Sequence, residues 1–465
     1  MPDIRRGDRR VLLILVLVAL ALRIAYIIDV SDSPYFKFPI LDPYWYDAKA
    51  RDVLSGDLLA SGGSFRVPLY VYFVALSYLV FGLTYFGPLI MQALVGALSC
   101  ALIFIIARKV FGRTAGILAG AGFALYGMAV YSDGELQPTT IYMALMLASV
   151  YFVLLALERR RPSYGLLAGA CLGFAFLTRP DILPFGILLA LVLLLAFRDR
   201  GGVRVAVLAA SVLLCFMVLL GIRNRAAFGE FYIFSPQGAV NLYIGNARYA
   251  DGKSAVAPPT RRPYDVSADP AEDSVTLACR MKAAEETGRM LSDRELSRYY
   301  VSRTFDEIGA DPGAWIGLMI RKAYYFLNSY ERSDVKLLPR FIEKHSRVLK
   351  LPLLNFGTVL VFGAVGIFLA ARRRNRLAWV LGAGVAACAV NSVMFFVLWR
   401  FRLPAVPFLV MFAGYGVYEV YHLLRLRSWK VLALAAAIAA VVSLVCFSRL
   451  WGVHEEKWKS HFLIN

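Results

Sequence analysis

The sequence predicts an all-α protein that crosses a membrane many times. Of its 465 residues, 59% are hydrophobic and only 18% are charged, and the mean hydropathy is +0.61. Apolar runs of roughly 16–22 residues recur along the chain, close to the ~20 that a helix needs to cross the hydrocarbon core. A transmembrane helix satisfies its backbone hydrogen bonds internally, so these runs are expected to be helical.

Clusters of lysine and arginine separate the apolar runs and assign a side of the membrane to each loop. Cytoplasmic loops carry an excess of these residues. The formal net charge of +19 is therefore explained by membrane orientation, and nucleic-acid binding is not expected. The basic clusters expected in the cytoplasm are 5–10, 108–113, 159–161, 198–204, 372–376 and 425–430.

Eleven apolar runs alternate between the two sides in agreement with these clusters, with the N-terminus inside and the C-terminus outside. This scheme requires the short, aromatic run 67–83 to stay on the outer side as an interfacial or re-entrant helix. The alternative is that 67–83 crosses and a later short run does not. The predicted spans are 11–29, 86–107, 114–131, 138–157, 164–178, 182–197, 203–222, 352–371, 377–398, 403–421 and 429–447.

Two large outer segments divide the chain into three predicted regions. Residues 1–222 form an N-terminal transmembrane module that includes the first outer loop, 30–85. Residues 223–351 are polar enough for a small periplasmic subdomain, and residues 352–465 form C-terminal helices with a short outer tail. Helical patterns in the middle region cover 272–308 and 314–328, the second amphipathic and expected on the membrane surface.

The first outer loop contains an acidic residue at a helix start, in the sequence PILDPYWYDAKARDVLSGD. Asp42 followed by Pro43 predicts an Asp N-cap with proline at the first helical position. Tyr46 then shares one helix face with Ala50, Val53 and Leu54, and Asp47 and Arg51 are spaced to pair at i,i+4. Asp42 is therefore either a capping residue or a general base at the mouth of a membrane cavity.

Several arginines lie at the outer ends of predicted spans, against the positive-inside bias. The planar guanidinium fork matches phosphate oxygens, so these residues suit a site for a lipid-linked phosphate. For any one of them, snorkelling towards lipid headgroups is an alternative. The residues concerned are Arg66, Arg179, Arg223, Arg225, Arg400 and Arg402.

Other polar residues map to the same outer face. The turn YSDGELQPTT brings Asp133 and Glu135 to the side of Asp42, where they suit an acceptor pocket or are ordinary loop acids. In the middle region, Asn241, Asn246 and Glu331 are candidates for donor or acceptor binding. Turn residues and a solvated helix end explain these three equally simply.

Metal ligands and disulfides have no recognisable pattern in this chain. The six cysteines include no CxxC pair, and five of them lie in or at apolar runs. The four histidines are scattered, so a zinc site is not expected.

The order of these motifs resembles the GT-C superfamily of membrane glycosyltransferases, in particular the bacterial protein mannosyltransferase and aminoarabinose transferase relatives of family 39. The motifs begin with D-x-x-x-Y-x-x-x-A from Asp42, followed by a basic residue and proline at Arg66-Val67-Pro68-Leu69 and a span ending in ARKVFGR. Later segments reading LTRPD, NLYIGNARYADG and WRFRLPAVP follow in the same order. Many relatives have two adjacent acids in the first loop, whereas this chain has Pro43 after Asp42.

The resemblance implies a polyprenyl-phosphate sugar donor and inversion at the anomeric carbon. It implies that Asp42 is catalytic and that Arg66 contacts the donor phosphate, with Glu135, or else Asp133, as a second acid. We expect Arg179, Arg400 and Arg402 to add to the phosphate site, and Tyr46 to lie beside it. No cofactor is expected, although some members hold a divalent cation between acidic loops, which here would involve Asp42 and Glu135.

The expected location is the bacterial inner membrane, with the active site on the periplasmic side. The sequence names neither the sugar nor the acceptor, which could be a glycan, a lipid or a protein. The main alternative is a transporter or flippase for lipid-linked sugars. Transporters usually place their charged sites near the bilayer midplane, whereas the unusual charges here lie at the outer ends of spans.

Overall fold

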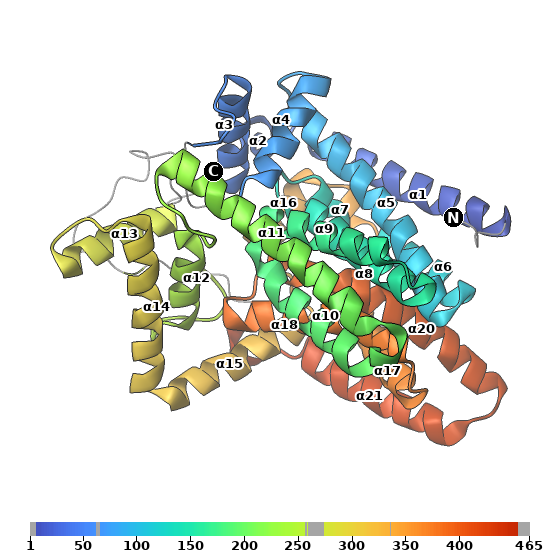
Figure 1. Ribbon diagram of the computed structural model, residues 1–465. Coiled ribbons are helices and arrows are strands. Elements are labelled where there is room, and N and C mark those ends of the chain that lie inside the picture. The colour runs from blue at the N-terminus through green and yellow to red at the C-terminus, as the bar shows by residue number, and fades with distance from the viewer. Residues whose placement is uncertain (1–5, 62–65, 256–257, 259–273, 335, 454–465) are drawn as a thin grey trace.

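The computed structural model describes residues 6–61, 66–255, 258, 274–334 and 336–453, and in this part every regular element is a helix. The predicted all-α class is therefore confirmed. Long helices lie side by side in one bundle, and a smaller group of helices stands beyond one end of it (Figure 1). The only bridge between extended residues in the described part joins Tyr126 to Leu354.

Eleven helices make up the bundle, and seven helical segments are long and apolar enough to cross a membrane. Four shorter apolar helices cover Leu69–Phe81, Pro162–Thr178, Pro180–Ala196 and Phe356–Arg372. The number of eleven spans stays a prediction. The bundle helices are α1 (Arg6–Val30), α5 (Phe86–Phe111), α6 (Arg113–Ala124), α8 (Thr139–Arg159), α9 (Pro162–Thr178), α10 (Leu183–Ala196), α11 (Gly202–Phe228), α17 (Phe356–Arg372), α18 (Arg376–Met394), α20 (Val406–Arg425) and α21 (Trp429–Phe447).

One predicted span is not a continuous helix. The run 114–131 is divided between α6 and the short α7 (Gly127–Asp133), because Tyr126 has an extended backbone and bridges Leu354. A hydropathy average does not reveal such a break, because the residues on both sides of it are apolar. Two other helices cross closely at Gly366 of α17, where an added Cβ would lie 1.9 Å from the carbonyl oxygen of Phe412.

The run 67–83 forms α4 (Leu69–Phe81), a helix of 13 residues. At ~1.5 Å per residue it is roughly 20 Å long, shorter than the ~30 Å hydrocarbon core. This length fits the predicted interfacial placement. Helix α4 packs on α3 (Asp42–Leu54) of the first outer loop, and α2 (Pro34–Lys37) precedes both.

Three helices of the middle region lie beyond one end of the bundle, α12 (Pro236–Asn246), α13 (Ser274–Thr287) and α14 (Asp293–Ala310) (Figure 1). They have a small core of their own, in which Val240, Ile244, Leu296 and Tyr300 are buried together with Phe396, which follows α18. The remaining helices of this region are α15 (Pro312–Leu327) and α16 (Leu338–His345), and α19 (Trp399–Arg402) lies between α18 and α20 in the chain.

The predicted helical pattern over 272–308 corresponds to two helices, α13 and α14, and its first two residues lie outside the described part of the chain. The pattern over 314–328 is confirmed as α15, while its contact with the membrane surface stays a prediction.

A buried ion pair fastens α1 to α7 inside the bundle. Arg23 of α1 donates to the carboxylate of Asp133, and Thr140 also donates to that carboxylate. Both charged side chains are almost completely shielded from solvent. Helix α5 passes so close that a Cβ at Gly96 would lie 2.0 Å from the Asp133 carboxylate.

Asp133→Asn should lower the free energy of unfolding by about 3–5 kcal/mol, because it leaves the Arg23 guanidinium buried without its counter-charge. Thermal unfolding in one detergent measures the change. The matched control is Glu158→Gln, which breaks the exposed pair with Lys109 and should cost less than about 1 kcal/mol. Equal losses in the two variants would contradict a structural role for the Arg23–Asp133 pair.

Candidate active site

A cavity of about 500 Å³ lies between residues of the loop 30–85, the middle region and one end of the bundle. Its lining is mixed, with apolar side chains from α10 and α14 beside charged groups from α3 and α19. Of the predicted site residues, it is lined by Asp42, Tyr46, Arg66, Arg179, Asn241 and Arg400. The other polar lining residues are Gln137, Thr139, Thr178, Asp181, Ser235, Gln237, Ser297 and Asn391.

Asp42 is the first residue of α3, and its side chain does not cap the helix. The residue before the helix is Leu41, and the cap has no side-chain hydrogen bond, so the expected N-cap role is wrong. The carboxylate instead accepts hydrogen bonds from Arg66 at one oxygen and from Arg400 at the other. The Asp42 carboxylate therefore pairs with two arginines from distant parts of the chain and does not bond to the nearby backbone N–H groups.

The two arginines control the charge of Asp42. Burial by itself would raise its pKa, but the attraction of Arg66 and Arg400 and their hydrogen bonds outweigh burial and hold the pKa well below the usual value for aspartate. Asp42 is therefore ionised at neutral pH. It is also a weak base for as long as both guanidinium groups stay on it.

The sequence analysis did not identify Asp334, a second carboxylate beside Arg400. Its Oδ2 lies 3.1 Å from Nη1 of Arg400, the same nitrogen that reaches Asp42. Burial and the charge of Asp42 raise the pKa of Asp334, with Arg400 opposing them. Asp334 lies in the connection between α15 and α16, where no motif or periodicity marks it.

Arg179 forms a separate charged arm of the cavity. It holds Asp181 through two hydrogen bonds of 3.1 and 2.6 Å, and its Nη1 donates to the backbone carbonyl of Arg400 at 2.9 Å. The arginine thus braces the segment that carries Arg400. Asp181 was also missed, although its place two residues after Arg179 in the LTRPD motif was a visible signal.

Aromatic rings fix the planes of these guanidinium groups. Arg66 lies over Trp45 and Tyr46, with its central carbon 5.1 and 5.0 Å from the ring centroids. Arg179 lies over Phe401 at 5.0 Å. Stacking of this kind orients arginine while leaving its N–H groups in the plane available for oxygen atoms. Tyr46 therefore lines the cavity, as predicted, and also positions Arg66.

Arg402 and Glu331 lie outside the cavity lining. Arg402 donates to Glu331 at 2.5 Å and to the carbonyl oxygen of Tyr330 at 2.9 Å, and Tyr126 also donates to Glu331 at 3.0 Å. These contacts hold the α15–α16 connection against α19. The structure thus separates Arg402 from Arg400, which the sequence had grouped in one phosphate site.

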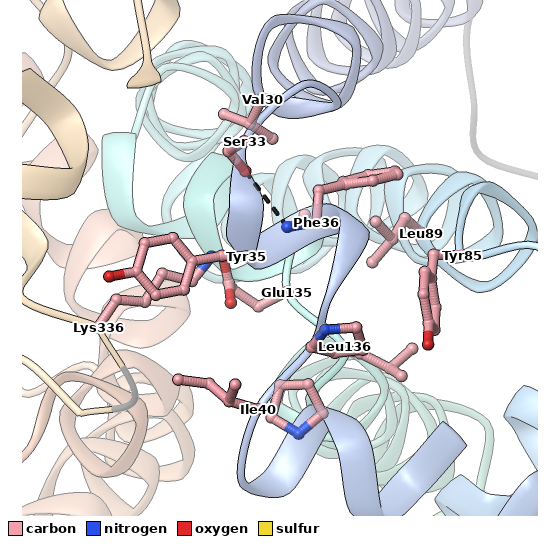
Figure 2. Close-up of a pocket in the computed structure, with 13 residues that line it drawn as sticks. Val30, Ser33, Tyr35, Phe36, Ile40, Tyr85, Leu89, Glu135, Leu136 and Lys336 are labelled. Atoms are coloured by element: carbon pink, nitrogen blue, oxygen red, sulfur yellow. Dashed lines mark hydrogen bonds and ion pairs between the residues drawn. The ribbon is translucent and has the colours of Figure 1, made fainter. Parts of the chain in front are cut away.

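Glu135 does not line the main cavity. The sequence analysis had placed it in one site with Asp42, and the structure separates the two. Glu135 pairs with Lys336 at 2.5 Å, and both side chains are buried beside a second cavity of about 40 Å³ (Figure 2). The ammonium group lies 4.1 Å from the ring centroid of Phe341. Figure 2 shows Glu135 and Lys336 side by side with Tyr35, below the chain that carries Ser33.

The remaining predicted residues are divided between the cavity and the framework. Asn241 lines the cavity, whereas Asn246 joins three helices. Its side-chain amide donates to the carbonyl of Met394 at 2.7 Å, and its oxygen accepts from the indole N–H of Trp315 at 3.0 Å. Asp133, which pairs with Arg23 inside the bundle, also lies outside the cavity lining.

A divalent cation has no preformed site among the described residues. No group of three or more His, Cys, Asp or Glu side chains is close enough there to hold a metal ion. The acids named above are instead paired with cations: Asp42 and Asp334 with arginine, Asp181 with arginine, and Glu135 with lysine.

One part of the sequence matches a known protein family. Residues 66–222 match the sequence profile of the family described as dolichyl-phosphate-mannose-protein mannosyltransferase. No curated protein matches the chain.

Two solved structures of an archaeal oligosaccharyltransferase share the fold, and a third structure matches with a lower score. The apo oligosaccharyltransferase of Archaeoglobus fulgidus matches 96% of this chain with a TM-score of 0.52 at 15% identity. The same enzyme tethered to an acceptor peptide matches 94% with a TM-score of 0.53, also at 15% identity. ArnT from Cupriavidus metallidurans bound to undecaprenyl phosphate matches 88% of this chain and 78% of its own, with a TM-score of 0.40 at 17% identity.

The chain spans about half the length of the archaeal enzyme, 55% and 54% in the two structures. The resemblance indicated by the sequence motifs is therefore confirmed at the level of the fold, and this chain has the GT-C fold of membrane glycosyltransferases over nearly its whole length.

Proposed function

We propose that this chain is an inverting glycosyltransferase that moves a sugar from a polyprenyl-phosphate donor to an acceptor at the periplasmic face of the bacterial inner membrane. The observation that carries the proposal is the carboxylate of Asp42, held between Arg66 and Arg400 in a cavity of about 500 Å³. The matched profile supports the donor class, since its family is named for a dolichyl-phosphate sugar.

The reaction needs one proton acceptor and one stabilised leaving group. The acceptor hydroxyl attacks the anomeric carbon from the face opposite the phosphate and forms the new glycosidic bond. The bond between that carbon and the phosphate oxygen breaks, and polyprenyl phosphate leaves with the electron pair. The hydroxyl proton passes to Asp42, which acts as the general base.

The arginines serve the leaving group. Charge develops on the phosphate as its bond to the sugar breaks, and guanidinium groups that contact the phosphate in the donor complex stabilise that charge. Arg66 and Arg400 meet at Asp42, so a phosphate that they bind lies next to the base. Arg179 braces the backbone of Arg400 and supplies a third cation to the cavity.

Asp42→Asn should lower turnover by about 10²–10⁴-fold, the usual contribution of a general base. The amide keeps the shape of the side chain and removes its basicity, so binding of polyprenyl phosphate should persist. Transfer of labelled sugar from a polyprenyl-phosphate donor in purified membranes measures turnover. Undiminished transfer by the variant would remove Asp42 from the mechanism, and translocation without transfer in wild type would favour a flippase.

Arg400→Gln should raise the donor KM by about 10–100-fold, because a hydrogen bond to a charged group contributes about 1.5–3 kcal/mol. The matched variant is Arg402→Gln, which changes a neighbouring arginine that lies outside the cavity lining. It should leave the donor KM of the folded protein unchanged while lowering its unfolding temperature, since Glu331 then loses its cationic partner and keeps only Tyr126. Equal KM values for the two variants would contradict the assignment of Arg400.

We further propose that transfer needs no divalent cation, because guanidinium and ammonium groups already neutralise the acids near the cavity. Treatment with EDTA should therefore leave the initial rate within about twofold of the untreated rate. A Mg²⁺ ion would have to displace Arg66 or Lys336 to reach a carboxylate. A loss of about tenfold or more with EDTA, restored by Mg²⁺ or Mn²⁺, would overturn this assignment.

A further inference from the structure

The charges around Asp42 are balanced before any ligand binds. We call Asp42, Asp334, Arg66 and Arg400 the Asp42 cluster. It contains two carboxylates and two guanidinium groups, so its formal charge is zero when all four are ionised. Arg179 is balanced separately by Asp181.

A phosphodiester donor would add one negative charge to this neutral cluster. Partly buried anions are stable only when a counter-charge is available to them. Arg400 has a hydrogen-bond donor ready, because its Nε is buried and finds no partner among the described residues. Its Nη1, however, is directed at the two carboxylates. One of these carboxylates must lose its charge if the donor is to bind a site with a net positive charge.

Asp334 is the carboxylate that is easier to neutralise. Asp42 accepts hydrogen bonds from both arginines, whereas the Oδ2 of Asp334 lies 3.1 Å from Arg400 and accepts no hydrogen bond from the described residues. Burial and the neighbouring charge of Asp42 raise the pKa of Asp334.

Some of the other charged groups around Asp334 lower its pKa, and others oppose them. Arg66 and Arg179 lower its pKa with Arg400, and the repulsion between Glu135 and Asp334 also raises the pKa of Glu135. Lys336 lies two residues along the chain and neutralises Glu135. Tyr131 is a buried phenol on the same side.

We propose that Asp334 takes up one proton when a polyprenyl phosphodiester binds, and that the freed guanidinium of Arg400 then turns to the phosphate. The proposal rests on the proposed function, because it takes the donor class from there. The step balances, with one proton and one monoanion added to the neutral cluster. Asp334 is a positioning residue in this scheme, acting on the donor through Arg400.

The proton uptake has a second consequence for catalysis. When Arg400 turns to the phosphate, Asp42 keeps only Arg66 as a close partner. Its carboxylate then becomes a better base at the moment when the donor is in place. Donor binding would thus activate the general base that the arginines hold at low basicity in the free protein.

The sign of the pH dependence follows from linkage. Donor affinity should be constant below the pKa of Asp334 and should fall by up to about tenfold per pH unit above it, because one proton is bound with each donor. The test uses polyprenyl methyl phosphate, a diester whose single charge does not titrate near neutral pH. Calorimetric titrations in two buffers of different ionisation enthalpy give the number of protons taken up, which we expect to approach one above that pKa.

Asp334→Asn should bind the diester with no proton uptake and with little change in affinity across the pH range, because the amide imitates the protonated acid. Glu331→Gln is the matched control, since it removes an acid from the same connection that pairs with Arg402 and not with Arg400. It should keep the proton uptake of wild type.

Three results would overturn the inference. Binding by wild type without proton uptake at any pH would do so even if Asp334→Asn failed to fold. Unchanged proton uptake by Asp334→Asn would show that another group takes up the proton. Absence of diester binding by wild type at every pH would instead refute the donor class in the proposed function, and the inference with it.

Discussion

The carboxylate of Asp42 is the contact on which the rest of the site depends. Its two partners lie 24 and 358 residues away in the sequence, so one side chain joins the first outer loop, the segment before α4 and the short α19 between two bundle helices. A buried carboxylate is stable only when opposite charges and hydrogen bonds replace its lost hydration. That requirement brings Arg66 and Arg400 to the same point and gives the cavity its cationic wall.

The connection between α15 and α16 supplies a second constraint. Within six residues it carries Glu331, Asp334 and Lys336, which pair with Arg402, Arg400 and Glu135 respectively. These ion pairs are largely buried and fasten the middle region to the bundle beside the cavity. These contacts hold the segment that carries Arg400 beside Asp42, within reach of the place where the phosphate is expected to bind and leave.

Balanced charge explains how a site with several buried arginines can be stable without a ligand. Each arginine at the cavity has a carboxylate partner, so the free protein does not hold uncompensated positive charge in a partly buried place. The same balance means that an incoming phosphate must compete with a resident acid for its contacts. Affinity, protonation and the basicity of Asp42 are therefore linked through Arg400.

The sequence alone identified the apolar helices and several polar residues that the structure places at one cavity. Length, hydropathy and basic clusters are local properties, and they were sufficient to select Asp42, Arg66, Arg179 and Arg400. They could not show the break at Tyr126, because an extended residue stabilised by a distant partner leaves hydropathy unchanged.

Only the tertiary structure decided which acid meets which cation. Arg400 and Arg402 share one short helix, but residues two apart differ by roughly 200° around a helix axis, so one lines the cavity and the other points to Glu331. In the same way Asp133 meets Arg23, Glu135 meets Lys336, and Asp334 meets Arg400. These pairings join residues far apart in the chain, and no local pattern encodes the packing that brings them together.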